Sequence, residues 1–180
     1  MKFWGKQKGL WIAGILLVGT CYQAGTAAAL SYGKDTVPEL TSDRGSNGAA
    51  TASVEENGHE AWRAFDNTAT SDSYWRAAAG DALAQISYEF DSKKVITQYT
   101  VQADTYDAAS APQEWIFAGK LGNRWLAIDE QSAQTDWTPG ERRTFDVNND
   151  VPYSGYGLFI SSNNGSEWIA VDDLELKEYE

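Results

Sequence analysis

Hydrophobic and polar residues alternate with a period of two over much of the second half of the chain. In AQISYEF (84–90), Ile86, Tyr88 and Phe90 alternate with polar residues, and TQYTVQA (97–103) repeats the pattern. This alternation predicts strands with one buried face. Similar patterns predict further strands at 114–121, 124–129, 142–147, 155–161 and 171–178.

Only one short segment favours helix. In NGHEAWRAF (57–65), Asn57 is placed to cap a helix with Glu60 three positions later. Short strands separated by turn residues, with almost no helix, predict an all-β domain, either a sandwich or a barrel. We expect Trp115 and Trp125 to be core residues rather than ligand contacts, because both lie within predicted strands.

Residues 1–29 have the layout of a signal peptide. Lys2, Lys6 and Lys8 precede a long uncharged stretch whose most apolar part is too short to span a membrane comfortably. A small-residue Ala-Ala-Ala run closes this segment and suits cleavage. A retained N-terminal anchor and a lipoprotein attached through Cys21 are the alternatives.

Cleavage at this point divides the chain into three parts. We expect a signal peptide at 1–29, a linker or extended lead-in at 30–48, and a single β-sandwich domain at 49–180. The expected location is secreted or cell-surface, in a bacterium. The mature chain then lacks cysteine, so neither disulfides nor thiol chemistry are expected.

The chain is strongly acidic. It has 14 Lys and Arg and 26 Asp and Glu, a net charge of −12. Loss of the three lysines of the signal peptide leaves 11 basic residues against 26 acidic ones, a net charge of −15. A chain with this charge repels nucleic acid and anionic membranes, so neither nucleic-acid nor direct lipid binding is expected.

The residues needed for common catalytic sites are largely missing. His59 is the only histidine, and the sequence contains neither a Gly-x-Ser-x-Gly motif nor a glycine-rich phosphate loop. Pairs of carboxylates could serve glycoside hydrolysis, but with 26 acidic residues such pairs carry little information. We therefore expect a protein that is not an enzyme.

The stretch EAWRAFDNTATSDSYWR (60–76) places a run of oxygen-bearing residues between two aromatic anchors. Ca²⁺ binds six to eight hard oxygens, and a tight loop can supply several of them. The candidate donors in this loop are Asp66, Thr68, Thr70, Ser71 and Asp72. A solvated turn has the same composition, so the residues alone leave both interpretations open.

A family resemblance adds to this evidence. The segments AWRAFDNTATSDSYW, AQISYEFDSKKVITQYTV, APQEWIFAG, RWLAID, RTFDV, YGLFI and VDDLEL occur in order along most of the mature chain. Together they resemble the factor V/VIII type C, or discoidin, superfamily, which includes the family 32 carbohydrate-binding modules. The resemblance implies a single jelly-roll β-sandwich, galactose-binding-domain-like, with a structural Ca²⁺.

The resemblance also implies which residues hold the ion. Asp66 corresponds to a carboxylate ligand and Arg63 to a backbone carbonyl ligand. Thr68 stands where the family has Asn or Asp, and Ser71 or Thr70 takes the position of the family's Thr. The remaining ligands are expected near the C-terminus, from the side chain of Asp173 and the carbonyl of Asp172.

In this family, ligands bind to loops at one end of the sandwich. Sugar recognition uses an aromatic face together with planar polar groups. Two loops, DTYDAASAP (104–112) and SSNNGSEW (161–168), offer both kinds of group. The ligand-binding candidates are Asp104, Tyr106, Asp107, Asn163, Asn164 and Trp168, with His59 and Arg76 expected at the same rim. Asn163-Asn164-Gly165 can equally be a plain turn, and Trp168 can equally cover the edge of the sandwich.

These observations predict a non-catalytic extracellular domain that binds a glycan or polysaccharide through loops at one end of a calcium-stabilised sandwich. The alternative is a cell-adhesion or interaction domain with a protein or matrix partner.

Overall fold

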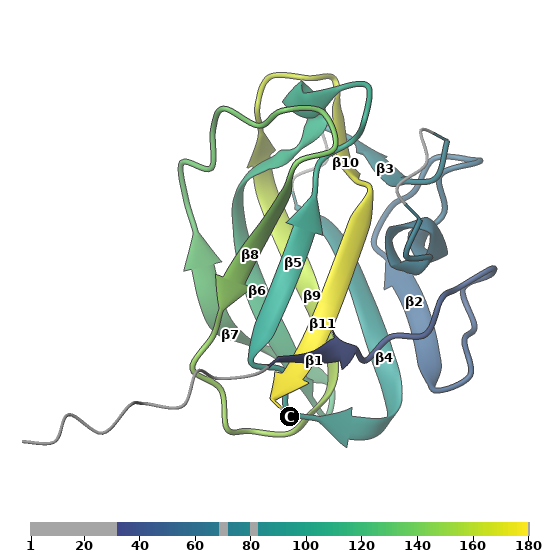
Figure 1. Ribbon diagram of the computed structural model, residues 1–180, viewed down its shortest axis with the longest axis vertical. Helices are drawn as coiled ribbons and strands as arrows, with labels where there is room; N and C mark the ends of the chain where they lie inside the picture. Colours follow the sequence, from purple (N-terminus) through teal and green to yellow (C-terminus); the bar gives the residue numbers. More distant parts are fainter. Residues whose placement is uncertain (1–31, 69–71, 80–82, 180) are drawn as a thin grey trace, which may run out of the picture.

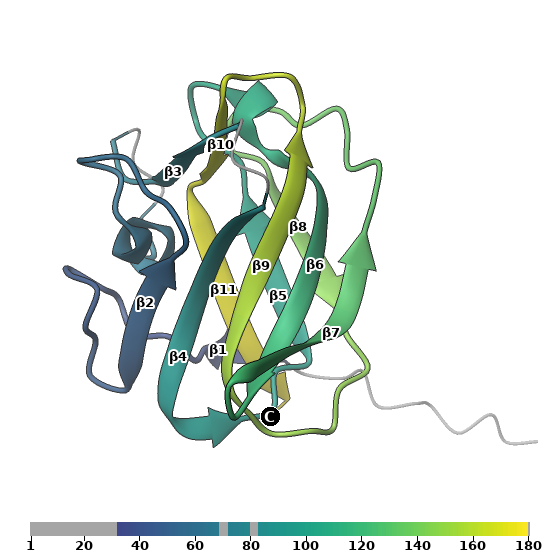
Figure 2. The same cartoon turned by 180° about the vertical axis from the view of Figure 1, so that it is seen from behind.

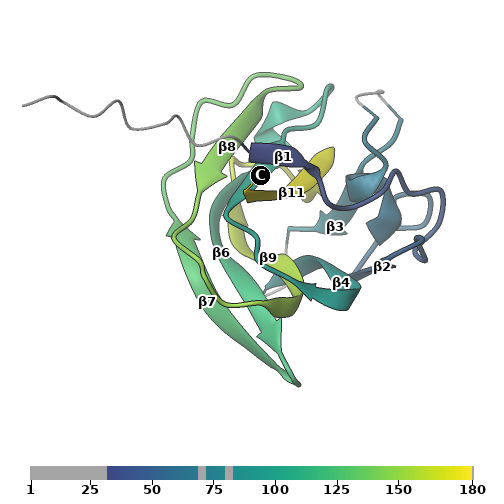
Figure 3. The same ribbon diagram turned by 60° about the horizontal axis from the view of Figure 1, so that its bottom comes forward.

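The alternating segments form two antiparallel sheets that pack face to face (Figure 1). The computed structural model describes residues 32–68, 72–79 and 83–179. The predicted signal peptide lies outside the described residues. Seen from below, the two sheets form separate layers (Figure 3). The predicted all-β sandwich is therefore confirmed.

The sheets have four and five strands. The first has the order β1 (Tyr32–Asp35), β11 (Asp173–Tyr179), β5 (Gln98–Gln102) and β8 (Arg142–Asp146). The second has the order β2 (Gly48–Ala52), β4 (Ala84–Lys94), β9 (Tyr153–Asn163), β6 (Pro112–Leu121) and β7 (Arg124–Gln131). A further pair joins β10 (Trp168–Val171) to β3 (Trp75–Ala78), and two short 3₁₀ helices are η1 (Ala61–Phe65) and η2 (Ala108–Ser110).

Large aromatic rings fill the space between the two sheets. Tyr99 of β5 stacks on Phe117 of β6 at 4.1 Å between ring centroids, and Phe117 stacks in turn on Tyr156 of β9 at 5.7 Å. Trp115 is 2% exposed, as predicted, and its Nε1–H donates to the Tyr99 hydroxyl at 3.0 Å. That hydroxyl donates to Asp129 at 2.8 Å, so the buried polar atoms of this cluster are paired.

Replacing Trp115 with Phe tests this hydrogen bond. The Trp115→Phe variant keeps an aromatic ring but loses the Nε1–H donor and some volume, so we expect the free energy of unfolding to fall by about 1–2 kcal/mol. Urea denaturation followed by circular dichroism measures this change. An unchanged free energy of unfolding would show that the bond to Tyr99 contributes nothing.

Trp125 is not in the core, and its prediction was wrong. Its ring is half-buried on the outer face of the five-stranded sheet, where it meets Phe159 edge to face at 5.3 Å. The two-residue alternation of β7 is interrupted, because the register between β6 and β7 shifts at Phe117 and Ala118. Such a β-bulge changes which face a side chain occupies, and sequence alternation alone does not reveal it.

The lead-in is also more structured than a linker. Val37 and Leu40 are each 2% exposed and belong to the core, and Thr36 N–H donates to the Leu176 carbonyl at 2.8 Å. Because β1 pairs with β11, described residues 32–48 are part of the domain.

The predicted helix is a single short 3₁₀ segment. It begins after Glu60, whose side chain makes no capping bond and instead accepts from Gly58 N–H at 2.9 Å. The predicted cap at Asn57 was therefore wrong. Within the described residues, no helix is long and apolar enough to cross a membrane.

Candidate functional site

Three loops meet at the upper end of the sandwich in Figure 1. They are the β5–β6 loop with η2, the β7–β8 loop and the β9–β10 loop. Between them lies a hollow of about 410 Å³, within the size range of ligand sites. Its lining consists of Ala108, Ala109, Gln113, Thr135, Asp136, Trp137 and Asn164.

The β7–β8 loop has an unusual backbone. Ala133 has φ of 54° and Asp136 has φ of 60°, in the left-handed region that residues with a Cβ rarely adopt. Such conformations cost of order 1–3 kcal/mol and tend to gather at ligand sites. The backbone here orients the Asp136 and Trp137 side chains at the hollow.

Hydrogen bonds to the neighbouring strand hold this loop in place. Gln134 N–H donates to the Gln113 carbonyl at 3.0 Å. The Trp137 indole N–H lies within hydrogen-bond distance of two carbonyl oxygens, Pro112 at 3.1 Å and Gln134 at 2.9 Å. The walls of the hollow are therefore fixed before a ligand arrives.

The Arg143 guanidinium contacts several residues of the β7–β8 loop. Its guanidinium lies 4.0 Å from the Trp137 ring centroid, as in a cation–π contact. It also donates to the Thr135 carbonyl at 2.9 Å and to the Gln134 side chain at 3.1 Å. Arg143 thereby fixes Trp137, which is only 8% exposed.

The three candidates in the β5–β6 loop have different environments. Tyr106 is 70% exposed and available for contact with a ligand. Asp104 is buried and accepts from Tyr106 N–H at 2.8 Å. Asp107 accepts from Ala109 N–H at 3.1 Å and from the Ser166 hydroxyl at 2.6 Å. The two carboxylates thus shape the loop, and Tyr106 presents the open aromatic surface.

The two asparagines of the β9–β10 loop also hold structure. Asn163 donates to the carbonyls of Ser166 and Trp168. Asn164 donates to the Ala111 carbonyl at 3.0 Å and to the Gln134 carbonyl at 3.2 Å. Asn164 therefore ties all three loops together at the wall of the hollow.

Trp168, Arg76, Tyr74 and His59 stack in succession, with the Arg76 guanidinium 5.9 Å from the Tyr74 ring centroid. The Arg76 guanidinium lies 4.3 Å from the Trp168 ring centroid and pairs with Glu56. His59 stacks on Tyr74 at 4.3 Å between centroids. One face of Trp168 is thus covered by Arg76, and none of these residues lines the hollow.

Sequence reasoning missed the β7–β8 loop altogether. Gln113, Thr135, Asp136 and Trp137 line the hollow but were not among the candidates. A signal was present, since SAQTDWTPG (132–140) places a tryptophan within a polar loop, as the two predicted loops place their aromatic residues.

The loop of the predicted calcium site is closed on itself by hydrogen bonds. Asp66 is 4% exposed and accepts from Thr68 N–H at 2.9 Å, from the Thr68 hydroxyl at 2.7 Å and from the Ser73 hydroxyl. Asn67 adopts φ of 54°, which asparagine tolerates well. Arg63 pairs with Glu60 through its side chain at 3.0 Å. Ser71 and Thr70 lie outside the described residues.

The two predicted C-terminal ligands are completely buried. Among the described residues, Asp172 Oδ1 and Asp173 Oδ1 have no hydrogen-bond partner. Burial, together with the charges of Asp104, Asp173 and Asp66, raises the pKa of Asp172 to about 7. Burial also raises the pKa of Asp173 to about 6, although the nearby Arg142 opposes that shift.

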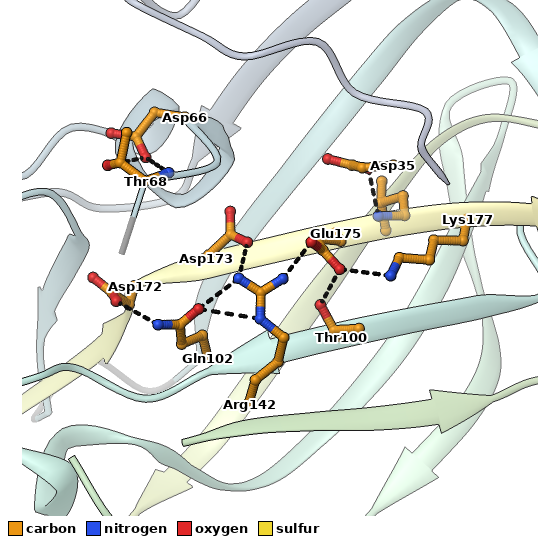
Figure 4. Close-up of polar contacts among 11 residues, drawn as sticks. Asp35, Asp66, Thr68, Thr100, Gln102, Arg142, Asp172, Asp173, Glu175 and Lys177 are labelled. Carbon is orange, nitrogen blue, oxygen red and sulfur yellow. Dashed lines mark hydrogen bonds and ion pairs between the residues drawn. The ribbon is translucent and has the colours of Figure 1, made fainter. Parts of the chain in front are cut away.

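These groups fit a hard cation in their chemistry. Buried carboxylate oxygens without partners are costly, and a divalent cation would satisfy them. In Figure 4 the Asp173 carboxylate points toward the loop that carries Asp66 and Thr68. Across the parts of the chain that the structure describes, however, no three His, Cys, Asp or Glu side chains converge on one point. Carbonyl and hydroxyl oxygens would have to complete the coordination.

Comparison with known proteins identifies the fold. No family model matches the sequence, and no curated protein is similar to it in sequence. The structure is similar to the family 32 carbohydrate-binding module of NanJ from Clostridium perfringens, solved with galactose. The TM-score is 0.65 at 13% identity, over 81% of this chain and 99% of that one.

Two further modules give the same result. One, from Clostridium perfringens in complex with GalNAc-β-1,3-galactose, has a TM-score of 0.61 at 18% identity, over 72% of this chain and 94% of the module. The other, a chitosan-binding module from Paenibacillus sp. IK-5, has a TM-score of 0.58 at 18% identity, over 72% of this chain and 94% of that chain. At these identities the similarity establishes the fold. The chain has the discoidin-like β-sandwich of the family 32 carbohydrate-binding modules.

Proposed function

We propose that this protein is a non-catalytic carbohydrate-binding domain, secreted or held at the cell surface, that binds glycan in the loop-end hollow. The observation that carries this proposal is the hollow itself, whose walls come from three loops that Asn164 joins, with Arg143 of β8 holding the β7–β8 loop. Of the three structurally similar modules, one was solved with galactose, one was solved with a GalNAc-galactose disaccharide, and one is a chitosan-binding module.

The hollow offers the groups that sugar recognition needs. Asp136 and Gln113 supply planar polar groups for pairs of hydroxyls, and Trp137 supplies an apolar wall. Tyr106, two residues before Ala108 of the lining, offers an exposed ring for the C–H face of a pyranose. Because the walls are already fixed, little ordering entropy opposes binding.

Calcium belongs to the same proposal as a stabilising ion. The carboxylates of Asp66 and Asp173 and the carbonyl of Asp172 would hold it, with oxygens of the Asp66 loop completing its shell. The ion would neutralise buried negative charge and join the loop to the start of β11, with no part in catalysis.

A glycan-array screen with two matched variants tests the loop-end site. Asp136→Gly removes the carboxylate but tolerates the positive φ of this position, and we expect binding to weaken about tenfold or more. Ala133→Gly, at the other positive-φ position of the loop, removes no functional group and should leave binding unchanged.

Hits on a related set of sugars that weaken only with Asp136→Gly would support the site. An array without hits, from protein that circular dichroism shows to be folded, would contradict the proposal. It would favour a protein or matrix partner instead.

A further inference from the structure

The outer face of the five-stranded sheet carries an apolar groove away from the loop-end site. This face looks toward the viewer in Figure 2, where β4, β9, β6 and β7 run side by side. The groove has a volume of about 310 Å³. It is lined by Leu83, Ile116, Ala118, Trp125, Ala127 and Phe159.

Strand register explains why a groove forms here. Ser87 of β4 pairs with Gly157 of β9, which lies beside Ala118 of β6, and Ala118 pairs with Ala127 of β7. Outward-facing residues in one row across a sheet are neighbours, so these four small residues make a low floor. A Cβ added at Gly157 would overlap Ser87, so larger residues are excluded at this point.

Larger side chains stand on both sides of this floor. On one side, Phe159 pairs in register with Ile116, which is 39% exposed, and Leu83 beside them is 56% exposed. Trp125 stands across the floor, where its ring meets Phe159 edge to face at 5.3 Å and the Lys120 ammonium lies 5.8 Å from its ring centroid. This groove, called the trough below, leaves aromatic and aliphatic side chains open to solvent. Exposed apolar surfaces of this kind often mark ligand-binding sites.

Two carboxylates lie at one end of the trough. Glu130 pairs in register with Ile116, and Glu114 lies two residues before it on the same strand. Both line an adjoining pocket of about 200 Å³, which shares Leu83, Ile116 and Phe159 with the outer-face groove. Among the described residues, neither carboxylate forms an ion pair.

We propose that this outer face is a second carbohydrate surface, and that its ligand is a cationic glycan built of amino sugars. The C–H faces of the sugar rings would lie on the trough, and their ammonium groups would meet Glu114 and Glu130. The inference takes the carbohydrate role from the proposed function but assigns a different ligand class to a different surface.

The negative charge of the protein favours a cationic glycan over an anionic glycan or a second copy of the chain. The chain carries a net charge of −12, which attracts a polycation and repels both an anionic glycan and a second copy of the same chain. A basic peptide also satisfies the charge and could pair with the edge strand β7, so direct competition between a peptide and the oligomer decides between them. A stacked sugar keeps its outer hydroxyls in water.

The test is calorimetric titration of the protein with a fully de-N-acetylated glucosamine oligomer. We expect the double variant Glu114→Gln/Glu130→Gln to bind at least tenfold more weakly, and Trp125→Ala to weaken binding as well. The control Glu39→Gln/Asp150→Asn removes the same charge from two exposed positions that make no ion pair within the described residues. It should stay within about twofold of the wild type. The N-acetylated oligomer of equal length should gain nothing from the two carboxylates.

Several outcomes would overturn the inference. These are the absence of binding, an equal loss in the control variant, which indicates net charge alone, or binding of a lysine-containing peptide of equal charge in preference to the oligomer. Asp136→Gly separates this inference from the proposed function, because it should weaken the array ligands and leave the amino-sugar oligomer unaffected.

Discussion

Replacing Arg142 with methionine should destabilise the domain by about 3–5 kcal/mol at pH 8. The Arg142 guanidinium lies 2.8 Å from the fully buried Asp173 carboxylate and pairs with Glu175, which is mostly buried (Figure 4). It also donates to the Gln102 side chain at 2.6 Å. Methionine has similar length and no charge, so Asp173 would remain buried without a counter-ion, whereas Glu175 would keep its ion pair with Lys177 at 2.8 Å.

The stability lost in Arg142→Met should be smaller at low pH than at high pH. The pKa of Asp173 is already raised to about 6, and losing the guanidinium raises it further. An acid with a raised pKa in the folded state destabilises the fold as pH rises through that pKa, so Arg142→Met should cost less at pH 5 than at pH 8.

Urea denaturation at both pH values measures this effect. Arg44→Met is the matched control, because Arg44 pairs with Asp91 at 2.8 Å where both side chains are at least half exposed, and it should cost below about 1 kcal/mol. Equal losses in the two variants, or a loss from Arg142→Met that is independent of pH, would contradict a buried Asp173 carboxylate that depends on Arg142.

Calcium should stabilise the wild-type domain most strongly at neutral and alkaline pH. Burial raises the pKa of Asp35 and of Asp172 to about 7, and of Asp173 to about 6, whereas unfolded carboxyls ionise near 3.8. In chelator, the free energy of unfolding should therefore fall between pH 5 and pH 8, by about 6 kcal/mol if the three groups titrate independently.

Calcium would bind the ionised carboxylates and should offset part of this fall. At a concentration about 100 times its Kd, a ligand that binds only the folded state adds about 2.7 kcal/mol. Thermal unfolding with calcium and with chelator, at pH 5 and pH 8, measures the difference. Asp173→Asn should abolish most of the calcium response, whereas Asp150→Asn, at an exposed position, should retain it.

A response to calcium that is equal at both pH values, or that survives in Asp173→Asn, would contradict the predicted ligand set. An absence of any response would leave the Asp66 loop as the hydrogen-bonded turn that the structure shows.

The strands that alternation predicted are those with one face on the aromatic core. In β4, Ile86 and Tyr88 are fully buried, so their two-residue spacing identifies the face of the strand that packs on the core. The strand β2, with the sequence GAATA, escaped prediction because small residues carry no contrast between faces. The strand β10, with the sequence WIAV, escaped because it alternates little and three of its four residues are buried.

The loop-end hollow was only partly predictable, because one of its three loops depends on backbone conformations that the sequence does not signal. The loops at 104–112 and 161–168 do meet at one end of the sandwich, which follows once their flanking strands are placed. The third wall depends on left-handed conformations at Ala133 and Asp136, and neither residue type signals them. Tertiary contacts of Gln134, Trp137 and Arg143 hold that backbone in place.

Chemical-shift mapping by NMR tests the carbohydrate site at the loop end most directly. Isotope-labelled protein, residues 30–180, is titrated with the tightest glycan from the array. Binding at the loop-end hollow should give chemical-shift changes that cluster in residues 106–113, 133–137 and 163–166 and saturate together. Shifts confined to the outer face of the five-stranded sheet, or none at any glycan concentration, would contradict a carbohydrate site at the loop end.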